Sequence, residues 1–212
     1  MNPILYPQIL PDHTARLLRL LEIKQSDFLR QFYLSGGTAL SLQLGHRESE
    51  DLDFFCERSF QPQEIEHQIS SLGALTQTEL AKGTFNCFLD GVKLQFLEYP
   101  YPVLEPFIKW QGVQISSLID IACTKLQTAG MRGSKKDFVD LFFLLQKYSL
   151  ETLLTYTKKK YSRVDYSETH ILKSLVYFAD ADGQPMPRMH EKVSWDQVKN
   201  GLIAAVKSID LL

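Results

Sequence analysis

The chain has 212 residues, of which 44% are hydrophobic, 23% charged and 11% aromatic. This balance is typical of a soluble globular protein and excludes a disordered chain, a collagen-like repeat and a bundle of membrane helices. The net charge of −2 excludes a generic polycation, although residues 1–100 carry a net −5 and residues 101–212 a net +3. A basic half suits an anionic partner, but so small an offset also fits ordinary surface scatter.

Cysteine usage and the N-terminal segment bear on the compartment. Cys56, Cys87 and Cys123 are odd in number and do not have the spacing of metal ligands, so we expect free thiols in a reducing compartment. The first residues lack a basic start followed by a long apolar stretch, which predicts no signal peptide. The sequence contains no run of about 18 apolar residues, so we predict no membrane span. We therefore expect a cytoplasmic protein with no membrane partner.

The first hundred residues mix helical and strand patterns. Apolar side chains at helical spacing predict helices over 12–23, 27–33, 38–44 and 62–72. Alternating or continuous apolar residues predict strands over 51–55, 85–89 and 92–97. Asp90-Gly91 links the last two strands, and a two-residue Asp-Gly link is among the strongest hairpin signals.

Prolines at positions 100, 102 and 106 mark a change of character, because the segments beyond them are mostly helical in pattern. We expect helices over 117–129, 136–147, 149–161, 168–178 and 194–209, with a loop over 179–188. The helix over 136–147 is apolar almost all round and should be buried. The predicted fold class is α+β: an N-terminal α/β unit with a small mixed sheet, residues 1–100, followed by a helical unit, residues 101–212.

The informative stretch is Ser35-Gly36-Gly37-Thr38, followed after twelve residues by Asp51-Leu52-Asp53. Two glycines let a ligand approach the backbone closely, and a helix that opens at Thr38 aims free N–H groups at an anion such as phosphate. Asp51 and Asp53 alternate on a strand and so share one face. Paired carboxylates repel unless a cation lies between them, and oxygen ligands suit Mg²⁺. A site that binds both a metal ion and a triphosphate is typical of enzymes that catalyse nucleotidyl transfer.

A second cluster lies in the helical half. Asp137 and Asp140 are three residues apart and therefore share one face of an otherwise apolar helix. One interpretation is structural, in which the two acids pair with Lys125, Arg132 or Lys136. The other is functional, in which Lys125 binds phosphate while an aspartate orients it or assists the metal.

Four stretches, in this order, carry a family resemblance. They are Gly36-Gly37-Thr38-Ala39-Leu40, Arg47-Glu48-Ser49-Glu50-Asp51-Leu52-Asp53-Phe54-Phe55, Lys125, and Lys136-Asp137-Phe138-Val139-Asp140-Leu141. Together they resemble the AbiEii/AbiGii toxin family of nucleotidyltransferases over roughly residues 30–145. The resemblance implies a DNA-polymerase-β-like nucleotidyltransferase core, a helical C-terminal half and Mg²⁺-dependent use of a nucleoside triphosphate. Some members of the family transfer nucleotides to tRNA acceptor ends and so block translation, and a separately encoded antitoxin neutralises such toxins.

The resemblance also implies roles for individual residues. The nucleotide-binding residues would be Gly36, Gly37, Thr38, Arg47, Ser49 and Lys125. The metal ligands would be Asp51 and Asp53, and the catalytic residues would be these two together with Lys125 and Asp137. For Asp140, capping or bracing the helix stays open beside a catalytic role. The implied partners are a nucleoside triphosphate, a tRNA 3′ end as acceptor and a cognate antitoxin.

One position departs from the pattern of polymerase-β-like enzymes, which often place a third carboxylate on a following strand. Gln95 occupies the corresponding position here, and an amide cannot usefully accept a proton. Either Asp137 or Glu98 substitutes, or no base is needed, or the activity is reduced. Three hypotheses therefore stay open. They are an active nucleotidyltransferase, a catalytically weak or inactive module of the same fold that binds nucleotide, RNA or protein, and a purely structural partner that keeps the fold but not the site.

Overall fold

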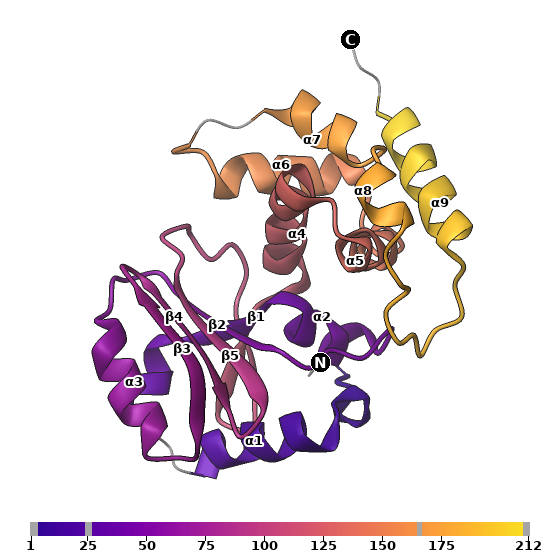
Figure 1. The fold of residues 1–212 in the computed structure, drawn as a ribbon. Coiled ribbons are helices and arrows are strands. Elements are labelled where there is room, and N and C mark those ends of the chain that lie inside the picture. The colour runs from indigo at the N-terminus through magenta and orange to yellow at the C-terminus, as the bar shows by residue number, and fades with distance from the viewer. Residues whose placement is uncertain (1–3, 24–26, 165–166, 210–212) are drawn as a thin grey trace.

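The computed structural model describes residues 4–23, 27–164 and 167–209. A seven-stranded sheet with the order β3-β4-β5-β2-β1-β7-β6 forms one unit, and a group of helices forms a second unit above it (Figure 1). The strands are β1 Tyr33–Ser35, β2 Leu52–Cys56, β3 Leu75–Ala81, β4 Thr84–Leu89, β5 Val92–Glu98, β6 Ile108–Trp110 and β7 Val113–Ile115.

The sheet is mixed, as predicted. β2 runs parallel to β5 and antiparallel to β1, while β1 runs parallel to β7. The hairpin predicted at Asp90-Gly91 is confirmed, because β4 and β5 pair antiparallel across it and both turn residues have positive φ. β3 was not predicted: most of its side chains are exposed, so the strand lacks the apolar alternation by which half-buried strands are found.

Three α-helices and two short 3₁₀ helices belong to the sheet unit. They are η1 Pro7–Ile9, α1 Asp12–Ile23, η2 Asp27–Gln31, α2 Gly36–Leu44 and α3 Pro62–Ser70. Figure 1 shows α1 and α3 beside the sheet, away from the helical unit, whereas α2 lies between the sheet and that unit. The predicted helix over 27–33 is a 3₁₀ helix and was wrong only in its last two residues. It ends at Gln31, because Tyr33, Leu34 and Ser35 are all buried and form the strand beside β2.

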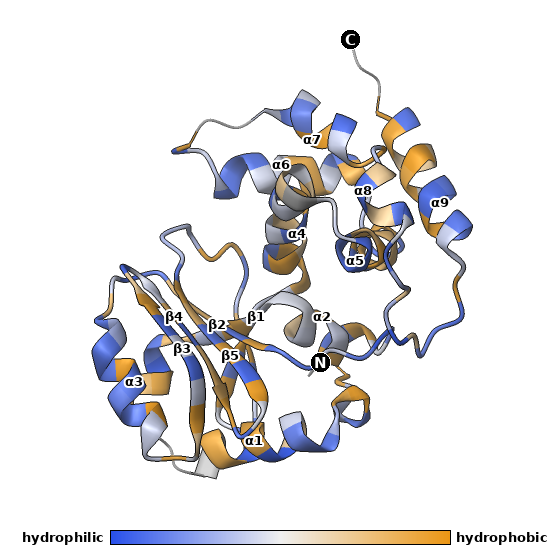
Figure 2. Cartoon of the chain, viewed as in Figure 1, coloured by the Kyte–Doolittle hydropathy of each residue, from blue (hydrophilic) through white to orange (hydrophobic). Residues whose placement is uncertain are grey.

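The helical unit contains α4 Leu118–Arg132, α5 Lys135–Leu145, α6 Leu150–Lys160, α7 Glu168–Ser174, α8 Ala179–Asp182 and α9 Trp195–Lys207. Ser117, Ser149, Ser167 and Ser194 each accept a hydrogen bond from a backbone N–H in the first turn that follows, which explains why α4, α6, α7 and α9 begin where they do. Figure 2 shows hydrophilic and hydrophobic residues alternating along α3 and α9, as expected for helices with one buried face.

Two further differences concern the second half of the chain. Residues 108–115, beyond the predicted boundary at residue 100, add β6 and β7 to the sheet through the pairing of β7 with β1. The predicted loop over 179–188 begins with the single turn α8.

The predicted burial of α5 is confirmed, since Phe138, Val139 and Leu141 are inaccessible to solvent. Within the described residues, no helix is both long and apolar enough to span a membrane.

Candidate active site

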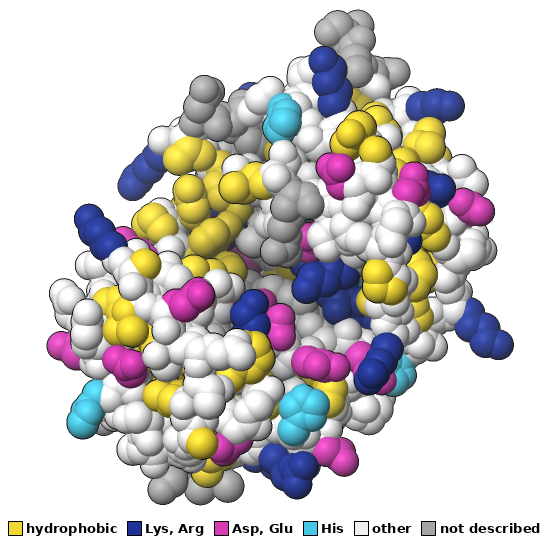
Figure 3. All heavy atoms as spheres, viewed as in Figure 1, with side chains coloured by type: hydrophobic (Ala, Val, Ile, Leu, Met, Phe, Trp, Pro, Cys, Tyr) yellow, Lys and Arg dark blue, Asp and Glu magenta, His cyan; other side chains and the backbone are white. Residues whose placement is uncertain are grey.

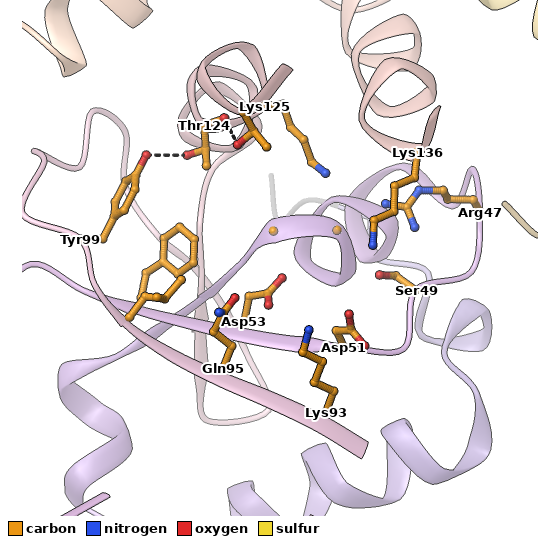
Figure 4. A pocket seen from close by; sticks show the side chains of 15 residues that line it. Arg47, Ser49, Asp51, Asp53, Lys93, Gln95, Tyr99, Thr124, Lys125 and Lys136 are labelled. Atoms are coloured by element: carbon orange, nitrogen blue, oxygen red, sulfur yellow. Dashed lines mark hydrogen bonds between the residues drawn. The ribbon is translucent and has the colours of Figure 1, made fainter. Parts of the chain in front are cut away.

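A cleft of about 300 Å³ lies where the sheet unit meets α4 and α5 (Figures 3 and 4). In Figure 3, Lys and Arg side chains gather where the surface is hollowed between the two units. The cleft is lined by Gly36, Gly37, Arg47, Ser49, Asp51, Asp53, Phe55, Lys93, Gln95, Leu97, Tyr99, Thr124, Lys125, Thr128 and Lys136. Of the residues predicted to act in catalysis or nucleotide binding, only Thr38 and Asp137 are absent from this lining.

The glycine pair allows charged side chains to approach the backbone at the start of α2. Gly36 has φ +66°, and a Cβ atom on it would lie 2.2 Å from Oδ2 of Asp53. A Cβ atom on Gly37 would lie 2.8 Å from Nη2 of Arg47 and 2.9 Å from Oγ of Ser49. Any larger residue would therefore displace the side chains that line the cleft. The helix begins at Gly36, two residues before the predicted start, so its first N–H groups belong to the glycine turn.

Thr38 has a structural contact instead of a place in the cleft. Its side chain is buried, and Oγ1 donates a 2.5 Å hydrogen bond to the backbone oxygen of Asp51. This bond ties the first turn of α2 to the residue that precedes β2. Thr38 thus links the two elements that carry the glycines and the aspartates.

Asp51 and Asp53 point into the cleft from the start of β2 (Figure 4). Burial raises the pKa of the half-buried Asp53 carboxyl, and the negative charge of Asp51 raises that pKa further. Lys125, Lys136 and Lys93 act on the same pKa in the opposite direction. The pair therefore demands a counter-charge, which a divalent cation satisfies well. Among the described residues, no group of three or more His, Cys, Asp or Glu forms a metal cluster.

Behind the cleft lies a buried network of charges. Lys125 Nζ is 2.7 Å from Oδ1 of Asp137 and 2.6 Å from Oδ2 of Asp140. Arg47 binds Asp140 with two nitrogens, Nε at 2.7 Å and Nη2 at 2.8 Å, and His46 Nε2 lies 2.8 Å from the same carboxylate. The predicted pairing of the two acids with Lys125 is confirmed. Asp137 is inaccessible to solvent, and its carboxylate accepts a hydrogen bond from Lys125, which lines the cleft.

Burial and neighbouring charges shift the pKa values of Asp140 and His46 in opposite directions. The Asp140 carboxyl is fully buried, yet the cations of Arg47 and Lys125 hold its pKa well below the ordinary value. Burial lowers the pKa of His46 despite the neighbouring carboxylate, so the imidazole is neutral at pH 7. The network thus holds two cations and two anions. Lys125 has three donors, of which two bind carboxylates, and this leaves one for a ligand in the cleft.

Several residues of the cleft were not predicted as site residues. Lys93 and Gln95 are two apart on β5 and so share a face, and Lys136 is the second residue of the helix α5. The alternation in the β5 pattern was a signal that Lys93 faces the same way as Gln95. Thr124 and Thr128 lie one turn from each other on α4, and both line the cleft. Of the acids considered as substitutes for Gln95, Asp137 and Glu98 are both absent from the lining.

Two solved structures share the fold of this protein. A crystal structure from H. pylori, classed as a nucleotidyltransferase, has a TM-score of 0.56 at 17% identity and covers 93% of this chain and 94% of its own. MenT4, a nucleotidyltransferase toxin from Mycobacterium tuberculosis, has a TM-score of 0.50 at 15% identity, with 95% and 87% of the two chains covered. The fold is therefore that of the nucleotidyltransferases, as predicted.

The family follows from the sequence comparisons. The model of the Nucleotidyl transferase AbiEii toxin family, Type IV TA system, matches residues 19–96, which include the glycine turn and the aspartate pair. An uncharacterised protein of Aquifex aeolicus is 42% identical over 184 residues, spanning 83% of this chain and 86% of that protein. The chain belongs to the AbiEii nucleotidyltransferase toxin family, which confirms the predicted resemblance. Lys125 and Asp137 lie outside the matched segment.

Proposed function

We propose that this protein transfers a nucleoside monophosphate from a nucleoside triphosphate to an acceptor hydroxyl, in a Mg²⁺-dependent reaction. The observation that supports it most is the convergence, in one cleft, of the glycine turn, the aspartate pair Asp51 and Asp53, and Lys125 of a distant helix. These groups match an anionic triphosphate. Phe55, Leu97 and Tyr99 line the same cleft and offer apolar surface for a nucleoside.

In the proposed reaction, the cationic and N–H groups of the cleft would bind phosphate, and its carboxylates would bind the metal ion. The N–H groups of the glycine turn, the Ser49 hydroxyl and the cations Arg47 and Lys125 would hold the phosphates. Asp51 and Asp53 would hold Mg²⁺, and their shared face and mutual repulsion fit such an ion. When bound, the ion would neutralise charge on the phosphates and the leaving pyrophosphate.

The acceptor hydroxyl would attack the α-phosphorus while pyrophosphate leaves. Phosphoryl and nucleotidyl transfers depend mainly on positioning and charge neutralisation, so Gln95 in place of a third carboxylate is compatible with activity. Lys125 is held by two carboxylates and Arg47 by a bidentate contact with Asp140, so both cations are already in position before a substrate binds. Such fixed groups cost no reorganisation during the reaction.

The acceptor and the partner protein are proposed from the family. We expect a tRNA 3′ end as the acceptor and an antitoxin that neutralises the protein, because the matched family is described as a toxin of a type IV toxin–antitoxin system. The three cysteines are free and buried, in accord with the reducing cytoplasm that we propose as its compartment.

The test is transfer from each of four labelled triphosphates to a tRNA pool. Asp51→Asn and Lys125→Ala should each abolish labelling and any growth arrest on expression. Asp196→Asn, a highly exposed carboxylate on α9, is the matched control and should label as the wild type does. Undiminished labelling by both cleft variants would overturn the proposal.

A second candidate function rests on Gln95, which stands opposite Asp53 where a third carboxylate is often found. In this alternative the protein binds nucleotide, RNA or a protein partner without turnover. Calorimetry separates the two, because a binding module would show heat of nucleotide binding but no product with any triphosphate and the tRNA pool.

A further inference from the structure

Gln95 lies beside Asp53 on the floor of the cleft. β2 and β5 are parallel neighbours, and their register pairs Asp53 with Gln95. Both residues line the cleft, and Figure 4 shows their side chains next to each other, with Asp51 further along the same floor. An oxygen carried by Gln95 would thus lie beside the paired carboxylates.

Hydrogen bonds across three strands fix which end of the Gln95 amide is left for the cleft. The carboxylate of Glu79 only accepts hydrogen bonds, and Asn86 Nδ2 donates to its Oε2 at 3.4 Å. Oδ1 of Asn86 therefore faces the other way, where it accepts from Nε2 of Gln95 at 2.9 Å. The amide nitrogen of Gln95 is thus engaged on the side of β4. Within the described residues, Oε1 of Gln95 forms no hydrogen bond with another protein group.

We propose that Oε1 of Gln95 is a third protein ligand, beside Asp51 and Asp53, of the divalent cation in the cleft. The inference rests on the proposed function and deepens it. Mg²⁺ and Mn²⁺ accept carbonyl and carboxylate oxygens, and side-chain amides supply such oxygens in other cation sites. Gln95 then acts as a ligand, for which an amide oxygen suffices, and not as a base, for which it does not.

A neutral third ligand changes the charge of the site. The protein would contribute two negative charges from Asp51 and Asp53, and Lys93 lines the same cleft as a nearby positive charge. Such a set binds a divalent cation weakly on its own, and the oxygens of a bound triphosphate supply the missing charge. Cation binding should therefore be strongly coupled to nucleotide binding.

The experiment is a Mn²⁺ titration of the full chain, followed by electron paramagnetic resonance, with and without a non-hydrolysable triphosphate. Gln95→Leu removes the oxygen at similar size and should weaken Mn²⁺ binding about tenfold or more, by comparison with changes around other metal sites. Gln95→Glu keeps an oxygen, adds charge and should bind Mn²⁺ more tightly than the wild type. Asn86→Leu should weaken binding by a smaller factor, because the Gln95 amide loses the bond that orients it.

The matched control is Gln114→Leu on β7, a glutamine outside the cleft whose Nε2 donates to the backbone of Arg30. It should bind Mn²⁺ as the wild type does. Unchanged Mn²⁺ binding in Gln95→Leu, or no gain in Gln95→Glu, would overturn this inference and leave the proposed function standing. A wild-type chain that binds no Mn²⁺ with any of the four triphosphates would instead overturn the proposed function itself.

Discussion

Lys125 belongs both to the buried charge network and to the cleft, so its replacement should affect stability as well as activity. Lys125→Met keeps much of the apolar stem but removes the ammonium that lies 2.7 Å from Asp137 and 2.6 Å from Asp140. Both carboxylates are inaccessible to solvent. Removing one partner of a buried ion pair leaves an uncompensated charge and costs about 3–5 kcal/mol.

This cost should be visible as a lower melting temperature. A change of 1 kcal/mol shifts the melting temperature by about 2–4 °C in a chain of this size, so we expect Lys125→Met to melt roughly 6–20 °C below the wild type. Differential scanning calorimetry at pH 7 is the assay. Lys136→Met is the control, since Lys136 lines the same cleft but is exposed, and its melting temperature should stay within about 2 °C.

An unchanged melting temperature in Lys125→Met would refute the reasoning, because it would mean that the carboxylates of α5 do not need the lysine as a partner. Lys125→Arg adds a second criterion. It keeps the charge but changes the shape, so it should recover part of the stability while transfer stays impaired.

Two other changes should separate function from stability. Asp53→Asn should raise the melting temperature while transfer is lost, because the amide removes both the cost of burying a charge and the repulsion from Asp51; a lower melting temperature would contradict this. His46 is buried and its pKa is lowered, so below pH 6.5 the unfolded chain binds a proton that the folded chain does not. Stability should therefore fall as the pH drops from 7.5 to 5.5, by at most about 1.4 kcal/mol per unit from this group, and the fall should be smaller in His46→Asn; equal slopes in urea melts of the two proteins would exclude His46 as the cause.

The parts of the fold that could be predicted are those in which local chemistry decides the structure. The Asp90-Gly91 hairpin needs positive φ at both residues, and a serine begins four helices of the second half. The parts that could not be predicted depend on long-range pairing. β1 is three residues long, and its position between β2 and β7 depends on residues about 20 and 80 positions away along the chain.

The candidate site also has parts that could be predicted from the sequence and parts that could not. The glycine turn and the aspartate pair are close in sequence, and their relation can be inferred from strand alternation and helix start. That Asp140 would contact Arg47, more than 90 residues away, could not be inferred from spacing. α5 packs against α2, and the loop that follows α2 carries Arg47 to Asp140, so Asp137 and Asp140 support the cations of the cleft.

The two walls of the cleft are joined by backbone hydrogen bonds as well as by this network. The segment between α8 and α9 returns to the sheet unit, where Glu48 N donates to the backbone oxygen of Arg188, and His190 N donates to that of His46. The loop that carries Arg47 and Ser49 is thus held on one side by Asp140 of α5 and on the other by this returning segment. A substrate that enters the cleft therefore meets phosphate-binding groups anchored from both units, and opening the cleft at this end would break the buried contacts of Arg47 as well as the backbone bonds.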